Sequence, residues 1–563
     1  MRQNIITADE MKAIDKNAAG LGMNPLQLME NAGAAAAEII FKFYTEKPDS
    51  VRAPILFFAG HGNNGGDIFV AARHLANLNV PSIVFLLGTE SQIKTPESQT
   101  NFKLLKQTNF ISVFEIKSES ALSEVFNSLE NRPKMIVDGI FGTGFSGSVK
   151  GLEKAAIGLI NAEKAARNIP VLAIDIPSGM PPADLSDSVD SKSNVSFSNI
   201  VKADATITFH KEKTFLKPEI AEKYAGEVFV CPIGIPENAE KFIGPGDVSL
   251  LFRRASDSKK GDSGKVLVIA GGPYSGAPAL AGMGALRTGV DIATIAAPQS
   301  IYKVVASFAP EFIVRKLSGD IFSENDISPV SELIRPHDVV VLGPGFGRAP
   351  ESAKAAAQLI PLLKKAVIDA DALVPEIFEA IVLKQKSDAP AEIVITPHYH
   401  EFLRTAAYFK INLPKDRADS NIDKTEAAAL KISQTLGAVV LLKGQNDLIA
   451  NGDEIRYNST GNAGMSVGGT GDVLAGAVGG LLAKNSAVKA AECGAYICGK
   501  AGDLAYADFG YSLLPTDLIS KIPAVLFPEI LEKAALNEIN SKSKKSKRGK
   551  NKNRNKKRGK KRS

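Results

Sequence analysis

Short apolar runs that alternate with amphipathic stretches constrain the fold of this chain more than any other feature. The first half contains PILFFAG (54–60), PSIVFLL (81–87), MIVDGIFG (135–142), VLAIDIPSG (171–179) and ADATITF (203–209). Continuous runs rich in β-branched residues, separated by helical segments, are typical of a mainly parallel sheet with helices on both faces. We therefore expect a doubly wound, three-layer αβα domain in the first half of the chain.

A second series of such runs begins at KVLVIAGG (265–272) and indicates a second domain of the same class. It continues through DIATIAA, DVVVLGPGFG, AVIDADAL, EIVITPH and AVVLLKG. The stretch between the two series, from 231 to 260, is rich in proline, glycine and charge and lacks a period, which favours a boundary there. We predict α/β domains over 1–240 and 250–538, followed by a tail over 539–563.

The positive charge of the chain is concentrated in that tail. Residues 541–563 carry fourteen Lys or Arg and no acidic residue, so the net charge of +6 becomes 6 − 14 = −8 for residues 1–540. The tail has no apolar side chain to bury, and we expect it to be disordered. Two interpretations stay open, a nonspecific contact with RNA or DNA through counterion release and a solvated tail that keeps the protein in solution. Without aromatic residues, base stacking is not expected.

Composition also excludes several classes of protein. No apolar stretch approaches the roughly 18 residues of a membrane-spanning helix, and the segment MRQNIITADEMKAID has acidic residues where a secretory signal is apolar. The three cysteines, Cys231, Cys493 and Cys498, are too few to form a disulfide framework in a chain of 563 residues. We expect a cytoplasmic protein with reduced thiols and no membrane partner.

A glycine-rich turn, AGHGNNGGD (59–67), follows the first apolar run and precedes the helical segment IFVAARHLANL. Glycines let the backbone approach a ligand closely, and the first N–H groups of a helix are available to a phosphate. We interpret the turn as a phosphate or dinucleotide cradle, with a tight structural turn as the alternative. The residues of this cradle are Asn63, Asn64, Gly65, Gly66 and Asp67.

Two aspartates end later runs of the first series. Asp138 is followed by the loop Gly142-Thr143-Gly144-Phe145-Ser146-Gly147, and Asp175 is followed by Pro177-Ser178-Gly179. In an open parallel sheet the carboxyl ends of the strands face the ligand crevice, so we predict that both aspartates belong to one site. The alternative is that each aspartate caps a helix.

The strongest local signal is the segment NAGMSVGGTGDVLAG (462–476). A glycine-rich turn that runs into an apolar helix places N–H groups around an anion, and Asp472 lies in the first turn of that helix. Phosphoryl transfer needs such amides and a carboxylate that accepts the proton of the attacking hydroxyl. We predict that Asp472 is that base and that Gly469, Thr470 and Gly471 form the anion hole. The alternative is an ordinary first-turn acid. The spacing is not that of a Walker-type loop.

The motifs of the first half resemble the epimerase domain of the NAD(P)H-hydrate repair enzymes, which interconverts the R and S epimers of hydrated NAD(P)H. GHGNNGGD, VDGIFGTGFSG and AIDIPSG carry this resemblance, in this order, over about residues 1–235. It implies a Rossmann-like domain in which Asn64, Asp138 and Ser178 ligate a potassium ion and Asp175 contacts the hydrated nicotinamide and assists proton transfer. Ile68 departs from the glycine usual in the family. The dinucleotide would be held by Asn63 to Asp67 and by Gly142, Thr143, Gly144, Phe145, Ser146, Gly147 and Ser148.

The motifs of the second half resemble the ribokinase-like NAD(P)H-hydrate dehydratase domain over about residues 255–535. They are KGDSGKVLVIAGG, GALRTGV, LGPGFGR, IDADAL, TPHYHEF, LLKG and GNAGMSVGGTGDVLAG. That family uses ADP or ATP to phosphorylate the extra hydroxyl of the S epimer, and phosphate elimination then restores NAD(P)H. His400 and Lys260 depart from its usual pattern. The resemblance places Ala285, Gly347, His398 and Asp472 on the hydrated dinucleotide. It places Gly471 and the loop Lys443, Gly444, Gln445, Asn446 and Asp447 on the adenine nucleotide, which Mg²⁺ would accompany.

Two domains that act on successive epimers of one damaged cofactor make the leading hypothesis a bifunctional epimerase and dehydratase. We expect it to bind hydrated NADH or NADPH and ADP or ATP, and to form a homo-oligomer. The order of the two domains resembles bacterial and archaeal members, for which ADP is the usual donor. A second hypothesis is a ribokinase-like kinase of a vitamin precursor that releases a stable phosphate. In a third hypothesis, the first half is a binding module without catalytic activity, and the tail attaches the protein to RNA.

Overall fold

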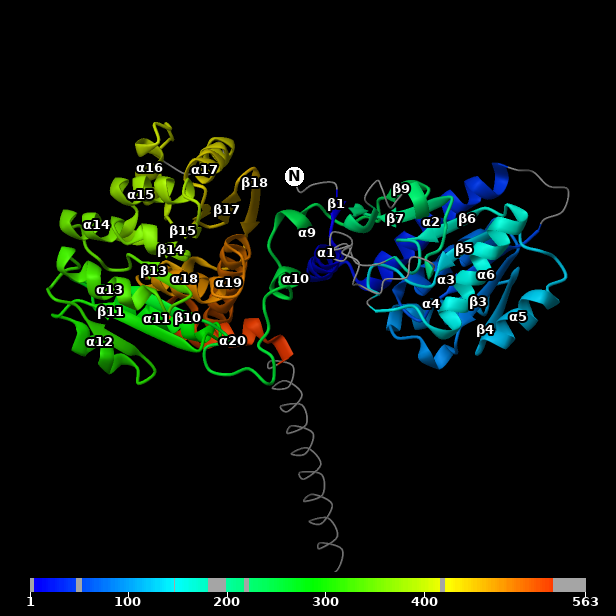
Figure 1. Cartoon of the computed structure of the whole chain (residues 1–563), viewed down its shortest axis with the longest axis horizontal. Coiled ribbons are helices and arrows are strands. Elements are labelled where there is room, and N and C mark those ends of the chain that lie inside the picture. Colours follow the sequence, from blue (N-terminus) through cyan, green and yellow to red (C-terminus); the bar gives the residue numbers. More distant parts are fainter. Residues whose placement is uncertain are drawn as a thin grey trace, which may run out of the picture. The chain divides into compact units, whose positions relative to one another are not determined.

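A computed structural model describes residues 5–46, 53–145, 147–180, 199–216, 222–415 and 421–529. It divides into two compact units, one from Arg2 to Glu240 and one from Lys241 onward. Each unit contains a sheet with helices on both of its faces (Figure 1). The predicted α/β class is therefore confirmed for both halves of the chain. Ser146 and the tail predicted to be disordered, 539–563, lie outside the described residues.

The sheet of the first unit is parallel throughout, and among the described residues it has seven strands in the order β4-β3-β2-β5-β6-β7-β9. The chain starts in the middle of this sheet, at β2, runs outward to β4 and then returns to β5 on the other side of β2. The carboxyl ends of β2 and β5 therefore flank the point at which the strand order reverses, where ligands bind in open α/β sheets. The strands are β2 (Ile55–Ala59), β3 (Ser82–Leu87), β4 (Ile111–Ile116), β5 (Met135–Gly139), β6 (Val171–Ile174), β7 (Ala205–Phe209) and β9 (Glu227–Cys231).

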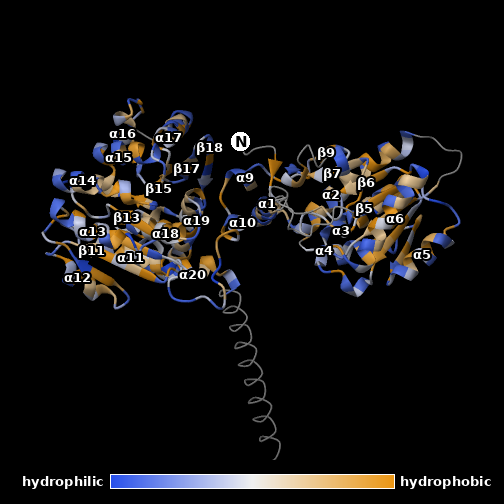
Figure 2. Cartoon of the chain, in the orientation of Figure 1, coloured by the Kyte–Doolittle hydropathy of each residue, from blue (hydrophilic) through white to orange (hydrophobic). Residues whose placement is uncertain are grey.

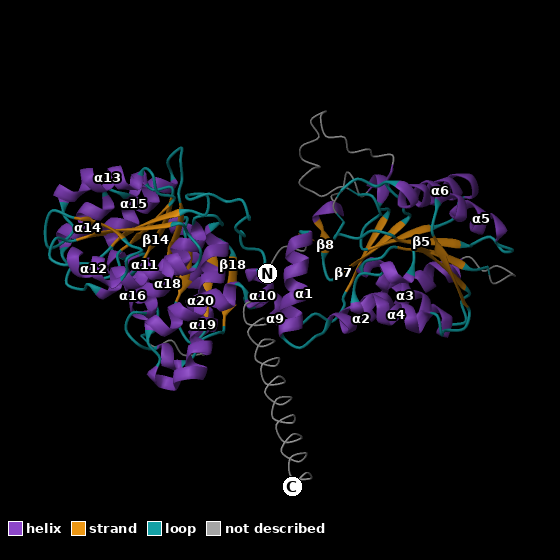
Figure 3. Ribbon diagram, turned by 90° about the horizontal axis from the view of Figure 1, so that it is seen from below, coloured by secondary structure: helices purple, strands orange, loops and turns teal. Residues whose placement is uncertain are grey.

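Helices cover both faces of this sheet, α5 and α6 on one face and α2, α3 and α4 on the other (Figure 3). Consecutive residues of a strand point to opposite faces, so Phe57 joins the core beneath α3 whereas Phe58 joins the core beneath α6. A short parallel pair, β1 (Ile5–Ile6) and β8 (Glu212–Lys213), lies outside the main sheet. The helices are α1 (Ala8–Gly20), α2 (Pro25–Glu46), α3 (Asn63–Asn77), α4 (Pro96–Leu105), α5 (Glu119–Ser128), α6 (Gly151–Arg167) and α9 (Asn238–Lys241).

The sheet of the second unit has nine strands among the described residues, in the order β12-β11-β10-β13-β14-β15-β16-β17-β18. All neighbours are parallel except β16 with β17 and β17 with β18, which form antiparallel hairpins at one edge. The order reverses between β10 and β13. The strands are β10 (Lys265–Ile269), β11 (Ile292–Ala297), β12 (Ile313–Lys316), β13 (Val339–Leu342), β14 (Lys365–Ile368), β15 (Glu392–Ile395), β16 (Val439–Leu442), β17 (Asp447–Asn451) and β18 (Glu454–Asn458).

Two apolar cores lie on the two faces of this sheet. Val266 and Val268 pack with α11, α18, α19 and α20, whereas Leu267 and Ile269 pack with α13, α14, α15 and α17. Central strands such as β10 and β13 are hydrophobic along nearly their whole length (Figure 2), as expected for strands buried on both faces. The helices are α10 (Pro245–Val248), α11 (Gly276–Arg287), α12 (Tyr302–Phe308), α13 (Ile327–Ile334), α14 (Pro350–Ala357), α15 (Pro375–Gln385), α16 (Tyr399–Tyr408), α17 (Ile422–Leu436), α18 (Thr470–Leu482), α19 (Ala487–Phe509) and α20 (Pro515–Leu526).

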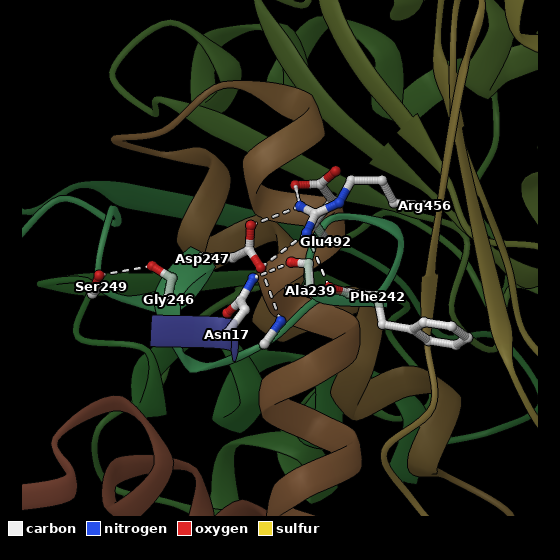
Figure 4. A network of polar contacts seen from close by, with 9 residues as sticks. Asn17, Ala239, Phe242, Gly246, Asp247, Ser249, Arg456 and Glu492 are labelled. Atoms are coloured by element: carbon white, nitrogen blue, oxygen red, sulfur yellow. Dashed lines mark hydrogen bonds and ion pairs between the residues drawn. The ribbon is translucent and has the colours of Figure 1, made fainter. Parts of the chain in front are cut away.

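Residues 241–249, which the sequence analysis leaves between its two domains, pack on the second unit. There a buried guanidinium, Arg456 of β18, donates to Asp247 Oδ1 of α10 (2.7 Å) and to Glu492 Oε2 of α19 (2.9 Å), as Figure 4 shows. All three side chains are buried, and the ion pairs tie the first turn of this unit to its sheet edge and to α19. No helix among the described residues is long and apolar enough to cross a membrane.

Candidate functional sites

In the first unit, the glycine-rich turn forms the start of α3 directly after β2. Gly62 caps the helix, and residues 63–67 form its first turn. A Cβ atom on Gly65 would lie 2.0 Å from the carbonyl oxygen of Gly60, and one on Gly60 would lie 2.0 Å from the carbonyl oxygen of Ile140. Glycine is therefore required where the loop after β2 meets the loop after β5. This approach brings the predicted cradle to the reversal point of the sheet.

The loop after β5 brings Asn64, Gly142 and Asp175 together. A Cβ atom on Gly142 would lie 2.7 Å from Asp175 Oδ2 and 3.3 Å from Asn64 Cγ. Asp175 has a left-handed backbone with φ of 66°, and its Oδ2 accepts a hydrogen bond from the Thr143 N–H (2.7 Å). A non-glycine residue in this conformation is strained, and such strain is common at functional sites.

Asp138 and Ser178 are joined by two hydrogen bonds beneath this loop. The Ser178 hydroxyl donates to Asp138 Oδ1 (2.6 Å), and its N–H donates to Oδ2 (2.8 Å). Both side chains are fully buried, and burial raises the pKa of Asp138 to about 6 although the hydrogen bonds from Ser178 lower it. The side chain of Asn64 is also buried, and its oxygen and nitrogen have no hydrogen-bond partner among the described residues. A buried amide whose polar atoms have no partner calls for a ligand.

The remaining residues of the predicted dinucleotide loop lie nearer the surface. Phe145 stacks on Phe141, with their ring centroids 3.9 Å apart. Gly144, Gly147 and Ser148 are exposed, and a Cβ atom on either glycine would meet nothing within 4 Å. Their contact with a dinucleotide stays a prediction.

Ile68, the departure from the family pattern, is fully buried in α3. A Cβ atom on Gly139 would lie 2.2 Å from Ile68 Cγ1, so the isoleucine fills the space above the glycine that ends β5. The turn before it forms without a positive φ at position 68. The larger side chain is accommodated by this contact with a glycine.

Two charged residues of the first site, Lys213 and Asp15, were not predicted from the sequence. The Lys213 ammonium is buried 3.8 Å from Asp175 Oδ1 and donates to the Phe209 carbonyl (2.7 Å). Burial raises the pKa of Asp15 to about 6, and burial together with Asp175 and Asp15 raises the pKa of Asp67 well above its ordinary value. Neither residue lies in a motif, so nothing in the sequence indicates them.

In the second unit, the turn before α18 has the geometry that the glycine-rich segment predicts. Gly469 caps the helix with φ of 104°, a conformation that favours glycine, and Asp472 lies in the first turn. The Thr470 hydroxyl donates to the Met465 carbonyl (2.9 Å), a hydrogen bond within the turn itself. A Cβ atom on Gly471 would lie 3.4 Å from Lys443 Nζ, so the lysine ammonium packs against this turn.

Three neighbouring strands place polar residues below the turn. Asp369 follows β14, Thr396 follows β15 and Lys443 follows β16. Asp369 Oδ1 accepts hydrogen bonds from Lys443 Nζ (2.9 Å) and from the Thr396 hydroxyl (2.8 Å). Asp369 lies within the motif IDADAL, but no role was predicted for it from the sequence. An acidic residue directly after a predicted parallel strand was the signal that could have found it.

The environment of Asp472 raises its pKa to about 7. Burial is the largest cause, Asp369 and Asp371 raise the pKa further, and Lys443 lowers it. An aspartate with a pKa near neutrality is suited to accept and release a proton at physiological pH.

Gly347 and His398 both border this site. The Gly347 N–H donates to Asp371 Oδ2 (2.9 Å), and the backbone of His398 pairs with that of Lys443. His398 Nδ1 accepts from the backbone N–H of Glu401 (3.3 Å) and caps α16, and burial lowers the pKa of its imidazole. Among the described residues no three His, Cys, Asp or Glu side chains are grouped as a metal site.

Ala285 is the predicted residue that the structure does not bring to the glycine turn. It is fully buried in α11, and a Cβ atom on Gly480 would lie 2.8 Å from its carbonyl oxygen. Gly480 is about two helical turns beyond Asp472 in α18. The role predicted for Ala285 stays a prediction.

The loop from Lys443 to Asp447 joins β16 to β17. Its two ends are tied together because the Gly444 N–H donates to Asp447 Oδ1 (2.9 Å). Gln445 and Asn446 are exposed at the tip of this loop. The predicted contact of these residues with an adenine nucleotide stays a prediction.

Comparisons with known proteins agree with both halves of this description. Residues 25–215 match the family described as YjeF-related protein N-terminus, and residues 266–524 match the family described as NAD(P)H-hydrate dehydratase. The bifunctional NAD(P)H-hydrate repair enzyme Nnr of Archaeoglobus fulgidus is 38% identical over 522 residues, which cover 92% of this chain and 98% of that protein. The chain belongs to the bifunctional NAD(P)H-hydrate repair enzyme family. This confirms the resemblance inferred from the motifs of both halves.

A further relative also matches over nearly the whole length of this chain. The enzyme of the same name from Moorella thermoacetica is 33% identical over 539 residues, which cover 93% of this chain and 96% of that protein. Among solved structures, the ADP/ATP-dependent NAD(P)H-hydrate dehydratase of Bacillus subtilis is 25% identical, with a TM-score of 0.42, and covers 50% of this chain and 96% of its own.

Proposed function

We propose that this chain repairs hydrated NAD(P)H. Its first unit interconverts the R and S epimers of hydrated NADH or NADPH, and its second unit dehydrates the S epimer at the expense of ADP or ATP. The observation that carries the proposal is that relatives with this name match along nearly the whole chain, across both units. The two activities are complementary, because the first converts the unusable epimer into the substrate of the second.

The second unit has the groups that phosphorylation of a hydroxyl requires. Asp472 takes the proton of the hydroxyl on the hydrated nicotinamide ring, and the oxygen attacks the terminal phosphorus of the nucleotide. The N–H groups of Gly469 to Gly471 and the Lys443 ammonium stabilise the charge on the transferred phosphate. Phosphate is a far better leaving group than hydroxide, and its departure together with a proton from the neighbouring ring carbon restores the double bond of the dihydropyridine ring.

The first unit has a strained aspartate for proton transfer and a set of oxygen ligands. Asp175 would contact the hydrated nicotinamide and assist proton transfer. Asn64, Asp138 and Ser178 would hold a potassium ion, which would supply positive charge beside the dinucleotide. The orphaned Asn64 amide and the hard oxygens of the other two residues support this assignment.

Mg²⁺ would enter the second unit with the nucleotide. Asp369, Glu401 and Asp472 interact with the Lys443 ammonium, and Asp371 interacts with Asp472, so the site has an excess of negative charge that suits a magnesium-bound nucleotide better than a bare one. A magnesium ion held largely by phosphate oxygens needs few protein ligands. We further propose a cytoplasmic homo-oligomer with ADP as the usual donor, and a nonspecific RNA or DNA contact through 541–563.

A coupled repair assay tests the proposal. The R epimer of hydrated NADH is incubated with the full chain and ADP or ATP, and recovery of reduced-nicotinamide absorbance is followed. We expect the wild type to restore the absorbance fully. Asp472→Ala should restore no absorbance from either epimer, although it should still interconvert the two epimers. A stable phosphorylated product without absorbance recovery would refute repair and favour a small-molecule kinase.

A further inference from the structure

The Asp369 carboxylate lies at the base of the second-unit site and is almost completely buried. Only 2% of the residue is exposed, and one oxygen, Oδ1, accepts from both Thr396 (2.8 Å) and Lys443 (2.9 Å). The three residues span 74 positions of the chain, from 369 to 443, and meet only because β14, β15 and β16 are neighbours. Any buried carboxylate needs hydrogen-bond partners. One partner of Asp369 is Lys443, which also reaches the proposed reaction site.

The ammonium held by Asp369 contacts the catalytic turn. Lys443 Nζ lies 3.4 Å from the place where a Cβ atom on Gly471 would be, so it packs against the backbone that begins α18. A lysine side chain is flexible and has about 2 kcal/mol of rotamer entropy. The hydrogen bond to Asp369 restricts this freedom before any ligand arrives. Charge that is already in place stabilises a transition state better than charge that must reorganise.

We propose that Asp369 is a positioning residue of the dehydratase, which holds the Lys443 ammonium against the Gly469–Gly471 turn where the phosphate is transferred. The inference rests on the proposed function, because it takes the turn to be the phosphate site. In this role Asp369 needs no contact with either substrate. It acts through the lysine and through its charge.

The charge of Asp369 also acts on the base. Asp472 interacts with Asp369, Lys443 and Asp371, and Lys443 interacts in turn with Asp369, Glu401 and Asp472. Removal of the Asp369 charge would remove a negative neighbour of Asp472 and leave the charge of Lys443 uncompensated. Both changes favour the ionised form of Asp472, so both lower its pKa.

Two substitutions that change the surroundings of Asp369 Oδ1 distinguish the proposed role of Asp369 from an ordinary contribution to packing. Asp369→Asn keeps an acceptor for Lys443 and Thr396 but removes the charge, whereas Thr396→Val removes a hydrogen bond to Asp369 and keeps the charge. With ADP and the S epimer at saturation, we expect the fall of kcat toward low pH to move about 1 unit lower in Asp369→Asn. It should stay at the wild-type pH in Thr396→Val. Asp369→Ala should lower kcat about 100-fold, because the ammonium is no longer held.

The outcomes separate this inference from the proposed function. A wild-type chain that does not restore NADH with ADP refutes the function, and the inference with it. An active wild type whose pH profile coincides with that of Asp369→Asn refutes the inference alone. So does an Asp369→Asn variant that is inactive at every pH while folded, because the amide retains the hydrogen bond that positioning needs. If Asp369→Ala does not fold, the comparison of Asp369→Asn with Thr396→Val still decides.

Discussion

The dehydratase activity of the second unit should fall as the pH drops through neutrality. Its proposed base, Asp472, has a pKa of about 7, because burial and the nearby Asp369 and Asp371 disfavour its charge more than Lys443 favours it. A group with this pKa is about nine-tenths ionised at pH 8, about half at pH 7 and about one-tenth at pH 6. An ordinary aspartate, with a pKa near 3.9, would be about 99% ionised at pH 6. We therefore expect kcat to fall about fivefold from pH 7 to pH 6.

The assay is the recovery of NADH absorbance from the S epimer at saturating ADP, between pH 5.5 and 9 at constant ionic strength. Asp472→Asn serves as the control, and its rate is subtracted at each pH as the background. A kcat that stays constant from pH 5.5 to 8 would refute the role of Asp472 as the base with a raised pKa.

The same shift predicts an effect on folding, which does not depend on activity. Because the folded state raises the pKa of Asp472, it binds the proton more tightly than the unfolded state between about pH 4 and pH 7, so stability falls as the pH rises through this range. The loss is complete above pH 7 and amounts to at most about 4 kcal/mol. Asp472→Asn should therefore raise the melting temperature at pH 8 and change it little at pH 4.

Three further substitutions test other parts of the structure. Asp175→Asn should abolish interconversion of the epimers and leave dehydration of the S epimer unchanged, as measured by chiral separation of the epimers and by NADH recovery; full epimerase activity would exclude Asp175 from proton transfer. In urea unfolding, Gly65→Ala should destabilise the first unit by about 2 kcal/mol or more, because its Cβ would lie 2.0 Å from the Gly60 carbonyl oxygen. The control Gly62→Ala should cost far less, because a Cβ atom at that position meets open space. Arg456→Met should cost about 3–5 kcal/mol in the same experiment, because Asp247 and Glu492 would remain buried without it; a loss below about 1 kcal/mol would contradict this.

Much of the fold could be read from local pattern. Continuous apolar runs such as ILFFA and KVLVI predict buried parallel strands, and these segments are β2 and β10. Glycine turns that run into apolar helices are equally local, since a helix start and a close backbone approach depend on a few consecutive residues. The positions of Asn64 and Asp472 in the first turns of α3 and α18 follow from such signals.

The order of the strands in each sheet has no local signal, because a buried strand carries the same pattern wherever it lies. The sequence by itself determined the two α/β halves, the glycine turns and the aspartate in the first turn of α18. Only the tertiary structure decided that Asp369, Thr396 and Lys443 meet on one oxygen and that Lys213 approaches Asp175. It also decided that Ala285 is buried about two turns of α18 away from Asp472. The physical reason is that parallel strands bring their carboxyl ends to one edge, so residues far apart in the sequence become neighbours only once the strand order is set.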